Sequence, residues 1–576
     1  MDIGKRKSVF DPYGYAKVDG VWNYGCFKYN AKDQVYDFIS YGRYIGVEKV
    51  SSDLDDGDKV ITIGFEDMCG EYNTVDVDRA LWGKKSELQS RLLALGADVV
   101  GQSINVLLGC LRQSEQTAEQ GACYHRTGWV FNKKLDDKGD PYVEQQFKAN
   151  SMIAVGVEPG QVHYVGNYDL CVKGTFSAWR EMVQEWVLGT VPLEVAVLIG
   201  LSPIISSGWG ARNLLFHFCG DSSKGKTSSA ILAVSVAGCP NPTETATRVN
   251  FKGKQLRSLM SSWRGTANAL TAKLDGLDGT LMVFDELSKL EDPKVLHSTL
   301  YTVSDGADKD RMESPTELQT TNTFRTNVLS LGEESLIKKV TAKNTGINIR
   351  VCEIIGEFTK SAEQSEAIVQ GCFENYGHAA SRFASYIIEG LSYKDVVQLR
   401  ERNLDEYTHA LEEAGCPSVS PRRLAEFGAI LLTVADIAET ALGINFSRDL
   451  IKEYLVKQQT DNDQNQDIGL RAHAALRGFV NTYVANFVTD GTFEWNKSIP
   501  CYGRIDTAKS GGAKEVSIET SQFPQIMEKL GFNNADLIIQ RLKAQGLLNY
   551  EAGKSYRKRI INKATGSVHV YVIVLP

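Results

Sequence analysis

A short glycine-bearing segment between an apolar run and a helix-forming run restricts this chain more than any other feature. Residues 220–227 read Gly-Asp-Ser-Ser-Lys-Gly-Lys-Thr and fit the pattern G-x-x-x-x-G-K-[ST]. The preceding residues 213–219 are apolar and have the length of a strand, whereas residues 228–236 can continue as a helix. Glycines in such a turn let successive N–H groups and the helix N-terminus face an anion. The segment therefore predicts an α/β fold with a phosphate site at a strand-to-helix turn.

The 220–227 loop assigns roles to individual side chains. Lys226 is expected to reach the β- and γ-phosphates of ATP, and Thr227 is expected to ligate Mg²⁺. A glycine turn that binds nothing is the alternative, which the flanking strand and helix disfavour. His217 and Cys219 are interpreted as core residues without chemistry. The other candidates for nucleotide contact are Gly220, Asp221, Ser222, Ser223, Lys224, Gly225 and Ser228.

A second apolar segment supplies carboxylates for hydrolysis. Residues 280–286 form a short apolar run that ends in Asp285 and Glu286. Asp285 is predicted to lie beside the Mg²⁺ ion, and Glu286 to polarise the water that attacks the γ-phosphate. A hydrophobic-Asp-Glu string is a weak signal by itself, so its meaning here depends on its position after the 220–227 loop.

Two further segments place polar residues at the ends of apolar runs. Residues 326–331 predict a strand, and in ring ATPases the polar residue that ends this strand senses the γ-phosphate. Ser330 is the candidate, with Asn327 behind it. Arg350 stands just before the apolar run 351–355, where ring ATPases place the arginine finger donated to a neighbouring subunit. A surface arginine at the start of a strand is the alternative.

In combination, these motifs are similar to the AAA+ family that is catalogued as a domain of unknown function in prophage primase-helicases. The chain especially resembles the self-loading replicative helicases of pathogenicity islands and cassette chromosomes, which are related to the minichromosome-maintenance class. The segments that carry the resemblance lie within residues 10–440 and are Gly128-Trp129, 220–227, 266–270, 284–286, Gly306 with Lys309 and Arg311, 329–333 and 346–350.

The resemblance implies a ring-forming ATPase, with six subunits expected, that uses ATP and Mg²⁺ to unwind DNA for the replication of a mobile element. Its implied partners are single-stranded DNA, double-stranded DNA, further copies of the chain and replication accessory proteins. Related helicases project a hairpin into the central channel from the position that Lys309 and Arg311 occupy here, so these residues are expected to hold the translocating strand. Because Asp308 and Asp310 alternate with them, a solvated surface turn is the alternative.

Patterning divides the rest of the chain into an amino-terminal region of short strands and a later region of helical periodicity. The strand-rich region carries no catalytic constellation, although an acidic loop occupies residues 53–58. In the helical region, Arg382, or alternatively Arg423, is a candidate for a second sensor that touches the nucleotide, and an exposed helix arginine is the favoured alternative. The expected domains are a β-rich accessory domain (1–175), an AAA+ ATPase core (176–370), an α-helical lid (371–465) and a winged-helix DNA-binding domain (466–576).

The carboxy-terminal prediction depends on the order of its elements. Residues 523–530 and 534–545 read as two helices, and a basic stretch at 554–559 with a strand pair around 564–566 follows them. This order resembles a winged helix, whose second helix enters a major groove while its hairpin grips phosphates. A protein-docking winged helix with a solvated charge run is the alternative. The expected DNA contacts are Arg541 and Lys543 on the helix, and Arg557, Lys558 and Arg559 on the hairpin.

Composition sets limits on partners and on cysteine chemistry. The chain has 576 residues, of which 43% are hydrophobic and 23% are charged, which fits about three to four ordinary globular domains. A net charge of −8 argues against a uniformly basic coat, so any DNA contact must come from local patches or from the inside of a ring. Eleven cysteines without a C-x-x-C pair indicate neither a zinc site nor a disulfide framework.

The most apolar stretch, 195–205, follows Glu194 and contains Pro203, so a buried helix is expected instead of a membrane span. The first residues carry no apolar export segment, and a cytoplasmic protein is expected. Two other function classes stay open: an ATP-regulated DNA-binding initiator or regulator without unwinding activity, and a non-helicase P-loop NTPase such as a kinase. The Asp-Glu pair favours hydrolysis, and Arg350 with the helical lid favours a ring.

Overall fold

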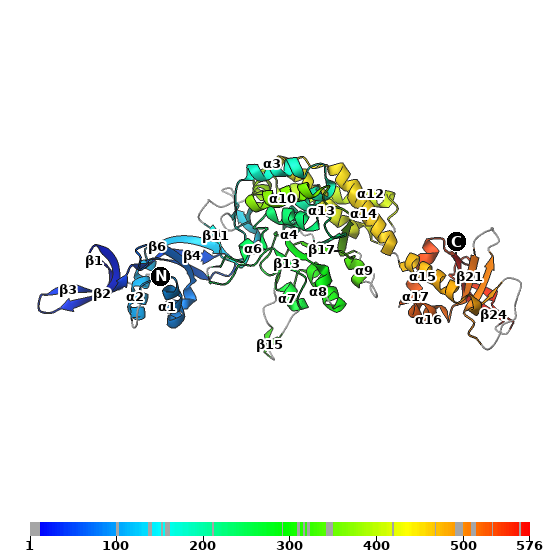
Figure 1. Cartoon of the computed structure of the whole chain (residues 1–576), viewed down its shortest axis with the longest axis horizontal. Coiled ribbons are helices and arrows are strands. Elements are labelled where there is room, and N and C mark those ends of the chain that lie inside the picture. Colours follow the sequence, from blue (N-terminus) through cyan, green and yellow to red (C-terminus); the bar gives the residue numbers. More distant parts are fainter. Residues whose placement is uncertain are drawn as a thin grey trace.

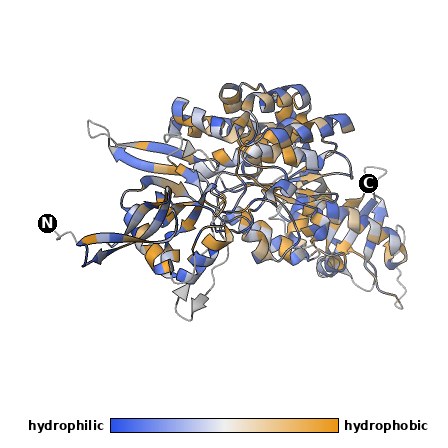
Figure 2. Ribbon diagram, turned by 60° about the vertical axis from the view of Figure 1, so that its left-hand side comes forward, coloured by the Kyte–Doolittle hydropathy of each residue, from blue (hydrophilic) through white to orange (hydrophobic). Residues whose placement is uncertain are grey.

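The computed structural model is elongated, with an amino-terminal, a central and a carboxy-terminal part arranged in chain order (Figure 1). The helices that cover the central part carry hydrophobic and hydrophilic residues side by side, as amphipathic packing requires (Figure 2). The structure describes residues 12–99, 103–135, 141–150, 154–155, 162–209, 212–250, 252–290, 292–307, 312–314, 317–318, 323–340, 349–416, 420–466, 468–489, 499–507, 514–532, 534–563 and 566–575.

The amino-terminal part is rich in strands, in agreement with the sequence pattern. One sheet has the antiparallel order β1-β2-β3, a second has the order β11-β7-β4-β5-β6, and a third has the order β10-β9-β8. The elements are β1 (Tyr13–Val18), β2 (Val21–Asn30), β3 (Val35–Arg43), β4 (Ile45–Asp53), β5 (Lys59–Glu66), β6 (Tyr72–Asp78), α1 (Lys85–Ala94), α2 (Ile104–Glu115), β7 (Glu119–Tyr124), β8 (Gly128–Leu135), β9 (Pro141–Lys148), β10 (Ala154–Val155) and β11 (Val162–Tyr164).

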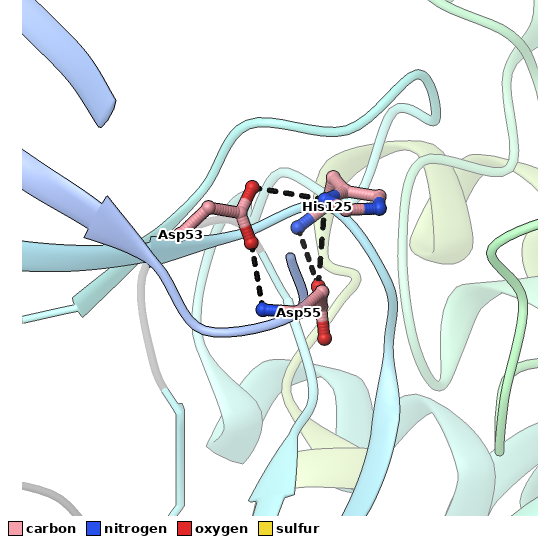
Figure 3. Close-up of side chains that lie close together, drawn as sticks. All are labelled: Asp53, Asp55 and His125. Atoms are coloured by element: carbon pink, nitrogen blue, oxygen red, sulfur yellow. Dashed lines mark hydrogen bonds and ion pairs between the residues drawn. The ribbon is translucent and has the colours of Figure 1, made fainter. Parts of the chain in front are cut away.

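A cluster of two aspartates and a histidine fastens the loop between β4 and β5 to the turn after β7 (Figure 3). The Nδ1 atom of His125 lies 2.9 Å from a carboxylate oxygen of Asp53. Asp55 accepts hydrogen bonds from the backbone N–H groups of His125 and Arg126 at 2.9 and 2.8 Å. The buried ammonium of Lys148 pairs with the other oxygen of Asp55. Because donors and a cation already engage these carboxylates, the cluster acts as a structural link.

The central part is built on a parallel sheet of order β13-β14-β17-β12-β18. All five strands point the same way, so their carboxyl ends meet at one edge, where α/β proteins bind ligands. The four strands expected from the sequence near 213–219, 280–286, 326–331 and 351–355 are present as β12, β14, β17 and β18. The elements are β12 (Leu215–Cys219), α5 (Lys226–Ser235), α6 (Pro242–Thr245), β13 (Met260–Ser262), α7 (Ala267–Thr271), β14 (Met282–Asp285), α8 (Pro293–Asp305), β15 (Met312–Ser314), β16 (Glu317–Leu318), β17 (Val328–Gly332), α9 (Leu336–Val340) and β18 (Val351–Ile355).

Helix α4 (Val191–Gly208) packs inside this part and follows α3 (Phe176–Trp186). In the described part of the chain, α4 is the one helix whose length and composition would suit a membrane span, and 89% of it is buried inside the protein. The expected buried helix around Pro203 is therefore confirmed. Asn327 donates hydrogen bonds to the hydroxyls of Ser202 and Ser206 on this helix at 2.7 and 2.9 Å. The buried amide of Asn327 consequently connects α4 to the central sheet by hydrogen bonds.

Five helices pack on the central sheet and share its core. Phe216 of β12 meets Phe427 of α13 edge-on, with ring centroids 5.5 Å apart. The hydrophobic core is continuous from the sheet through these helices. The helical periodicity expected in this region of the chain is therefore present as helices. They are α10 (Ala362–Glu374), α11 (Ala379–Gly390), α12 (Tyr393–Glu413), α13 (Pro421–Leu442) and α14 (Arg448–Gln466).

The carboxy-terminal part has its own hydrophobic core around helices and one sheet. The sheet runs in the order β19-β20-β21-β24-β22, and β23 pairs with β24. Both helices expected near 523–530 and 534–545 are present. The elements are α15 (Ile468–Thr482), β19 (Phe487–Thr489), β20 (Gly503–Thr507), β21 (Lys514–Glu519), α16 (Phe523–Lys529), α17 (Ala535–Ala544), β22 (Leu548–Asn549), β23 (Arg557–Ile560) and β24 (Ser567–Leu575).

Candidate functional site

The 220–227 loop closes tightly against the segment that follows β18. Gly225 caps α5 with a φ of 82°, a left-handed conformation that favours glycine. A Cβ atom on Gly225 would lie 2.5 Å from the hydroxyl of Thr359, and one on Gly220 would lie 2.5 Å from the carbonyl oxygen of Gly356. Ser223 also has a positive φ, of 62°. Gly225 is therefore favoured by its left-handed backbone, and Gly220 by the close approach of the second chain segment.

A cavity of about 700 Å³ lies at the carboxyl edge of the central sheet and is lined by residues of this loop. Asp285 and Glu286 at the end of β14 line its other side, together with Gly332 and Glu333 at the end of β17 and residues of the 357–366 segment. Residues 222–228 of the loop, which are expected to contact a nucleotide, thus line the same cavity as Asp285 and Glu286. A volume of this order suits a small-molecule ligand.

Side chains of the loop make hydrogen bonds that a bound anion would replace. The ammonium of Lys226 donates to the carbonyl oxygens of Gly220 and Asp221 at 2.7 and 2.6 Å. The exposed side chain of Thr227 lies at the first turn of α5, where the helix dipole favours negative charge. The hydroxyl of Ser228 lies 2.5 Å from that of Ser365, so it ties α5 to α10.

The acidic pair occupies a strained turn. Glu286 has a φ of 59°, an uncommon conformation for a residue with a side chain. Its N–H donates to the Asp285 carboxylate at 2.6 Å, and its own carboxylate pairs with Lys289. Burial raises the pKa of Asp285 above its ordinary value, which a nearby cation would reverse. The Thr227 hydroxyl and the Asp285 carboxylate are hard oxygen donors, the chemistry that Mg²⁺ prefers.

Ser330 does not line the cavity, in contrast to the expectation that it senses a phosphate. Its side chain is buried, and its hydroxyl lies 2.9 Å from both the Nδ1 atom of His217 and the Nε1 atom of Trp263. The polar residue that reaches the cavity from this strand is Glu333, which pairs with the hydroxyl of Ser222. Its position directly after the last residue of β17 is the signal that could have found it.

His217 is a core residue, as expected. Its Nε2 atom lies 3.0 Å from the carbonyl oxygen of Glu334, and burial lowers its pKa to about 4. The ring is consequently neutral near pH 7 and links β12 to β17 and to the residues that follow it.

Arg350 lies at the edge of the sheet opposite to the cavity, directly before β18. Its guanidinium carbon stacks 4.3 Å from the ring centroid of Tyr301. Arg212 donates to the carbonyl oxygens of both Ile349 and Arg423 at 2.7 Å, so it joins the β18 start to the start of α13. Arg423 therefore belongs to the Arg350 edge.

Arg382, the other candidate for a second sensor, is exposed on α11 and stacks 4.4 Å from the ring centroid of Phe176. It is absent from the described lining of the cavity. Lys360, which precedes α10, lines the cavity. Its ammonium donates to the carbonyl oxygen of Gly189 at 2.8 Å. A lysine in the connection between β18 and α10 gave no motif by which the sequence could identify it.

The expected channel residues Lys309 and Arg311 lie outside the described residues. The described strands that follow them in the sequence, β15 and β16, pair antiparallel, and Ala307 forms an isolated bridge with Thr323. Figure 1 shows β15 well away from the central sheet. Arg126 from the amino-terminal part binds Asp278 beside the bridge at Thr323, with an Nη2 to Oδ2 distance of 3.3 Å.

The expected basic cluster of the carboxy-terminal hairpin separates onto two faces of β23, because successive strand residues point to opposite sides. Lys558 is exposed. Arg559 lies on the other face, where it pairs with Glu515 at 2.6 Å and Asp506 at 3.7 Å. Arg559 is thus engaged with two carboxylates of this part in the structure, and its contact with phosphates stays a prediction.

The other expected DNA contacts of this part are partly engaged within it. Arg557 donates to the carbonyl oxygen of Tyr550 at 3.3 Å. On α17, the ammonium of Lys543 donates to the carbonyl oxygen of Lys554 at 2.9 Å and lies 4.3 Å from the ring centroid of Tyr550. Arg541 is half-buried on the same helix. Among the five basic residues expected to contact DNA in this part, Lys558 is therefore the most exposed to solvent.

Comparison with known proteins identifies the family. A family model described as "Domain of unknown function (DUF927)" matches residues 15–323, more than half of the chain, and the chain belongs to this family. A model described as "Cch helix turn helix domain" matches residues 467–576. A solved structure titled "SCCmec type IV Cch - active helicase" aligns with 98% of this chain and 98% of its own, with a TM-score of 0.70 and 22% identity. That likeness establishes the fold. No curated protein matches the chain.

Proposed function

We propose that the chain is an ATP-driven DNA helicase of a mobile genetic element, and that it works as an AAA+ ring. The observation that carries this proposal is the cavity in which the 220–227 loop faces Asp285 and Glu286. A phosphate cradle beside a paired carboxylate suits cleavage of the bond between the β- and γ-phosphates. The likeness to a structure titled as an active helicase, and the match to a helix-turn-helix model, support the choice of DNA as the partner.

In this proposal, the loop N–H groups and Lys226 bind the β- and γ-phosphates. Phosphate oxygens would take the place of the Gly220 and Asp221 carbonyl oxygens at the ammonium of Lys226. Thr227 and Asp285 would hold Mg²⁺, which neutralises charge on the transferred phosphoryl group. Glu333 is a further candidate to sense the γ-phosphate, because it reaches the cavity from the strand whose end that role requires.

Glu286 would position the attacking water and accept its proton as phosphate separates from ADP. Its carboxylate is paired with Lys289 in this structure, and both side chains are about half exposed at 51% and 49%. An exposed ion pair contributes little free energy, so water can compete with Lys289 for Glu286 at low cost.

Arg350 would complete the cavity of a neighbouring copy in the ring, since it lies across the sheet from its own chain's cavity. On the DNA side, the hairpin around Lys309 and Arg311 would hold the translocating single strand. The carboxy-terminal part would bind duplex DNA through α17 and Lys558.

Steady-state ATP hydrolysis measured with and without single-stranded DNA, together with strand displacement on a forked duplex, tests this function. We expect DNA to stimulate hydrolysis and the fork to be unwound. Hydrolysis that ignores DNA would instead favour a non-helicase NTPase. DNA binding that requires ATP but proceeds without unwinding would favour an initiator or regulator.

A further inference from the structure

The amino-terminal part contains a second cavity, of about 760 Å³, far along the chain from the nucleotide site. Four aromatic rings contribute to its lining, from Tyr15 of β1, Trp22 of β2, Tyr44 and Tyr72 of β6. The carboxy-terminal end of α2 closes one side with Gln113. Pockets of this volume with aromatic walls and few polar groups are typical of ligand sites.

The rings of this aromatic cavity are only partly covered by protein. Tyr15 and Tyr44 pack together with ring centroids 5.2 Å apart. Trp22 and Tyr72 remain 50% and 55% exposed. Both rings line the cavity and are open to an incoming molecule.

Three polar groups of the cavity have no hydrogen-bond partner within the described ranges: the hydroxyl of Tyr44, the side-chain amide of Gln113 and the indole N–H of Trp22. By contrast, the neighbouring Tyr15 hydroxyl donates to the carbonyl oxygen of Ile45 at 2.9 Å. Burial raises the pKa of Tyr44, so its hydroxyl stays protonated as a donor. An amide offers a donor and an acceptor in one plane, which complements the edge of a nucleobase.

Glu66 is the charged residue among the described residues that line the cavity, and its carboxylate is paired with Arg43 at 2.7 Å. The hydroxyl of Tyr72 donates to the carboxylate of Glu48, so a second carboxylate lies beside this wall. These carboxylates disfavour an anion inside the cavity. The ammonium of Lys17 lies 5.5 Å from the ring centroid of Trp22. A neutral planar ligand that carries a phosphate outward would match both features.

We propose that the aromatic cavity binds an unpaired nucleobase of single-stranded DNA. The base would stack against Trp22 and Tyr72, its edge would meet the Tyr44 hydroxyl and the Gln113 amide, and Lys17 would contact the adjoining phosphate. This inference rests on the proposed function, because that function supplies the single strand. A free nucleotide has the same base chemistry and is the other source that the experiment distinguishes.

The experiment uses the full chain and a short oligonucleotide that carries one 5-iodouracil. Fluorescence anisotropy measures its binding, and photo-crosslinking with mass spectrometry locates the base. The double variant Trp22→Ala/Tyr72→Ala is compared with Tyr29→Ala/Tyr36→Ala, whose rings are 56% and 51% exposed on the same part of the chain but outside the cavity. Stacking predicts about tenfold or greater loss of affinity for the cavity variant and little change for the control.

A crosslink to Trp22, Tyr72 or Tyr44, together with that loss, supports the proposal. Equal affinity of the cavity variant, the control and the parent overturns it. Trp22→Phe keeps a stacking ring and should retain most of the affinity, which separates stacking from misfolding. Competition by free dAMP at concentrations where a single-stranded competitor has no effect would overturn the assignment to a strand. If the parent shows no DNA-stimulated hydrolysis, the proposed function fails; if it does and the cavity variant still binds DNA normally, only this inference fails.

Discussion

Arg350 and Lys226 lie at opposite edges of the same parallel sheet. Lys226 follows β12, Arg350 precedes β18, and these strands pair in parallel with Leu215 opposite Val351. Five strand residues at about 3.3 Å each separate the edges by about 16 Å. The guanidinium of Arg350 therefore cannot serve the cavity of its own chain without rearrangement of the sheet, and a role in hydrolysis requires a second copy.

That arrangement predicts complementation between two inactive variants. Arg350→Ala and Lys226→Ala should each lose hydrolysis, because one removes a charge that stabilises the transition state and the other removes the phosphate contact. Mixed subunits should recover part of the turnover, since some interfaces pair an intact loop with an intact arginine. Hydrolysis is measured across mixing ratios, with assembly followed by light scattering and with Arg402→Ala, a change at an exposed arginine of α12, as the control that should stay active. Mixed rings without any recovery would exclude the trans role.

Glu286→Gln should preserve nucleotide binding and lower turnover by at least about 100-fold, because the amide cannot accept the proton of the attacking water. Isothermal titration with ATP and steady-state hydrolysis check the two halves of this prediction. Glu334→Gln provides the control, because Glu334 pairs with Lys339 at 2.9 Å outside the described lining of the cavity and should leave turnover unchanged. Parental turnover in Glu286→Gln would contradict the assigned role.

We expect substitution of Ser330 to lower the free energy of unfolding and substitution of Glu333 to lower the rate of ATP hydrolysis. Ser330→Ala leaves His217 and Trp263 with unpaired buried groups, which we expect to cost about 1–3 kcal/mol of unfolding free energy. Glu333→Gln should instead reduce turnover while thermal unfolding changes little, because its side chain faces the cavity. Denaturant unfolding and ATP hydrolysis on both variants measure the contrast. The reverse pattern would restore Ser330 as the group that senses the phosphate.

Local sequence signals are enough to predict several elements, whereas the direction of a side chain depends on the folded structure. β12, the 220–227 loop and α5 follow from one motif, and Asp285 follows from the end of an apolar strand. Ser330 was chosen because it is polar, yet it points into the core, whereas Glu333 beyond the strand end reaches the cavity. The partners of Arg559 likewise depend on the face of β23 that it occupies. The register between β23 and β24 sets that face, and a run of charged residues in the sequence does not reveal it.

The link between His125 and Asp53 should depend on pH. The hydrogen bond to Asp53, with the charges of Asp55 and Asp56, raises the pKa of His125 above its ordinary 6.5. A raised folded-state pKa contributes stability that is fully present below the unfolded value and is lost as the pH rises through the folded value. The Tm difference between the parent and His125→Asn should thus be larger at pH 6 than at pH 8.5. A difference that is constant over this range would mean that the imidazolium does not contribute.

The two expected DNA surfaces should respond differently to neutralisation. Lys309→Ala/Arg311→Ala should depress unwinding and DNA-stimulated hydrolysis while duplex binding stays nearly intact, because the proposed channel hairpin would contact the moving strand.

Lys558→Ala should weaken duplex binding and flatten its salt dependence, because an exposed cation that binds phosphate displaces counterions from DNA. Arg559→Ala is the matched control: its guanidinium already pairs with Glu515, so its loss should lower thermal stability more than duplex affinity. Binding isotherms at several salt concentrations and a forked-duplex assay measure all three. Normal unwinding by the Lys309/Arg311 variant would mean that other residues contact the translocating strand. A steep loss of duplex affinity in Arg559→Ala would mean that Arg559 contacts DNA.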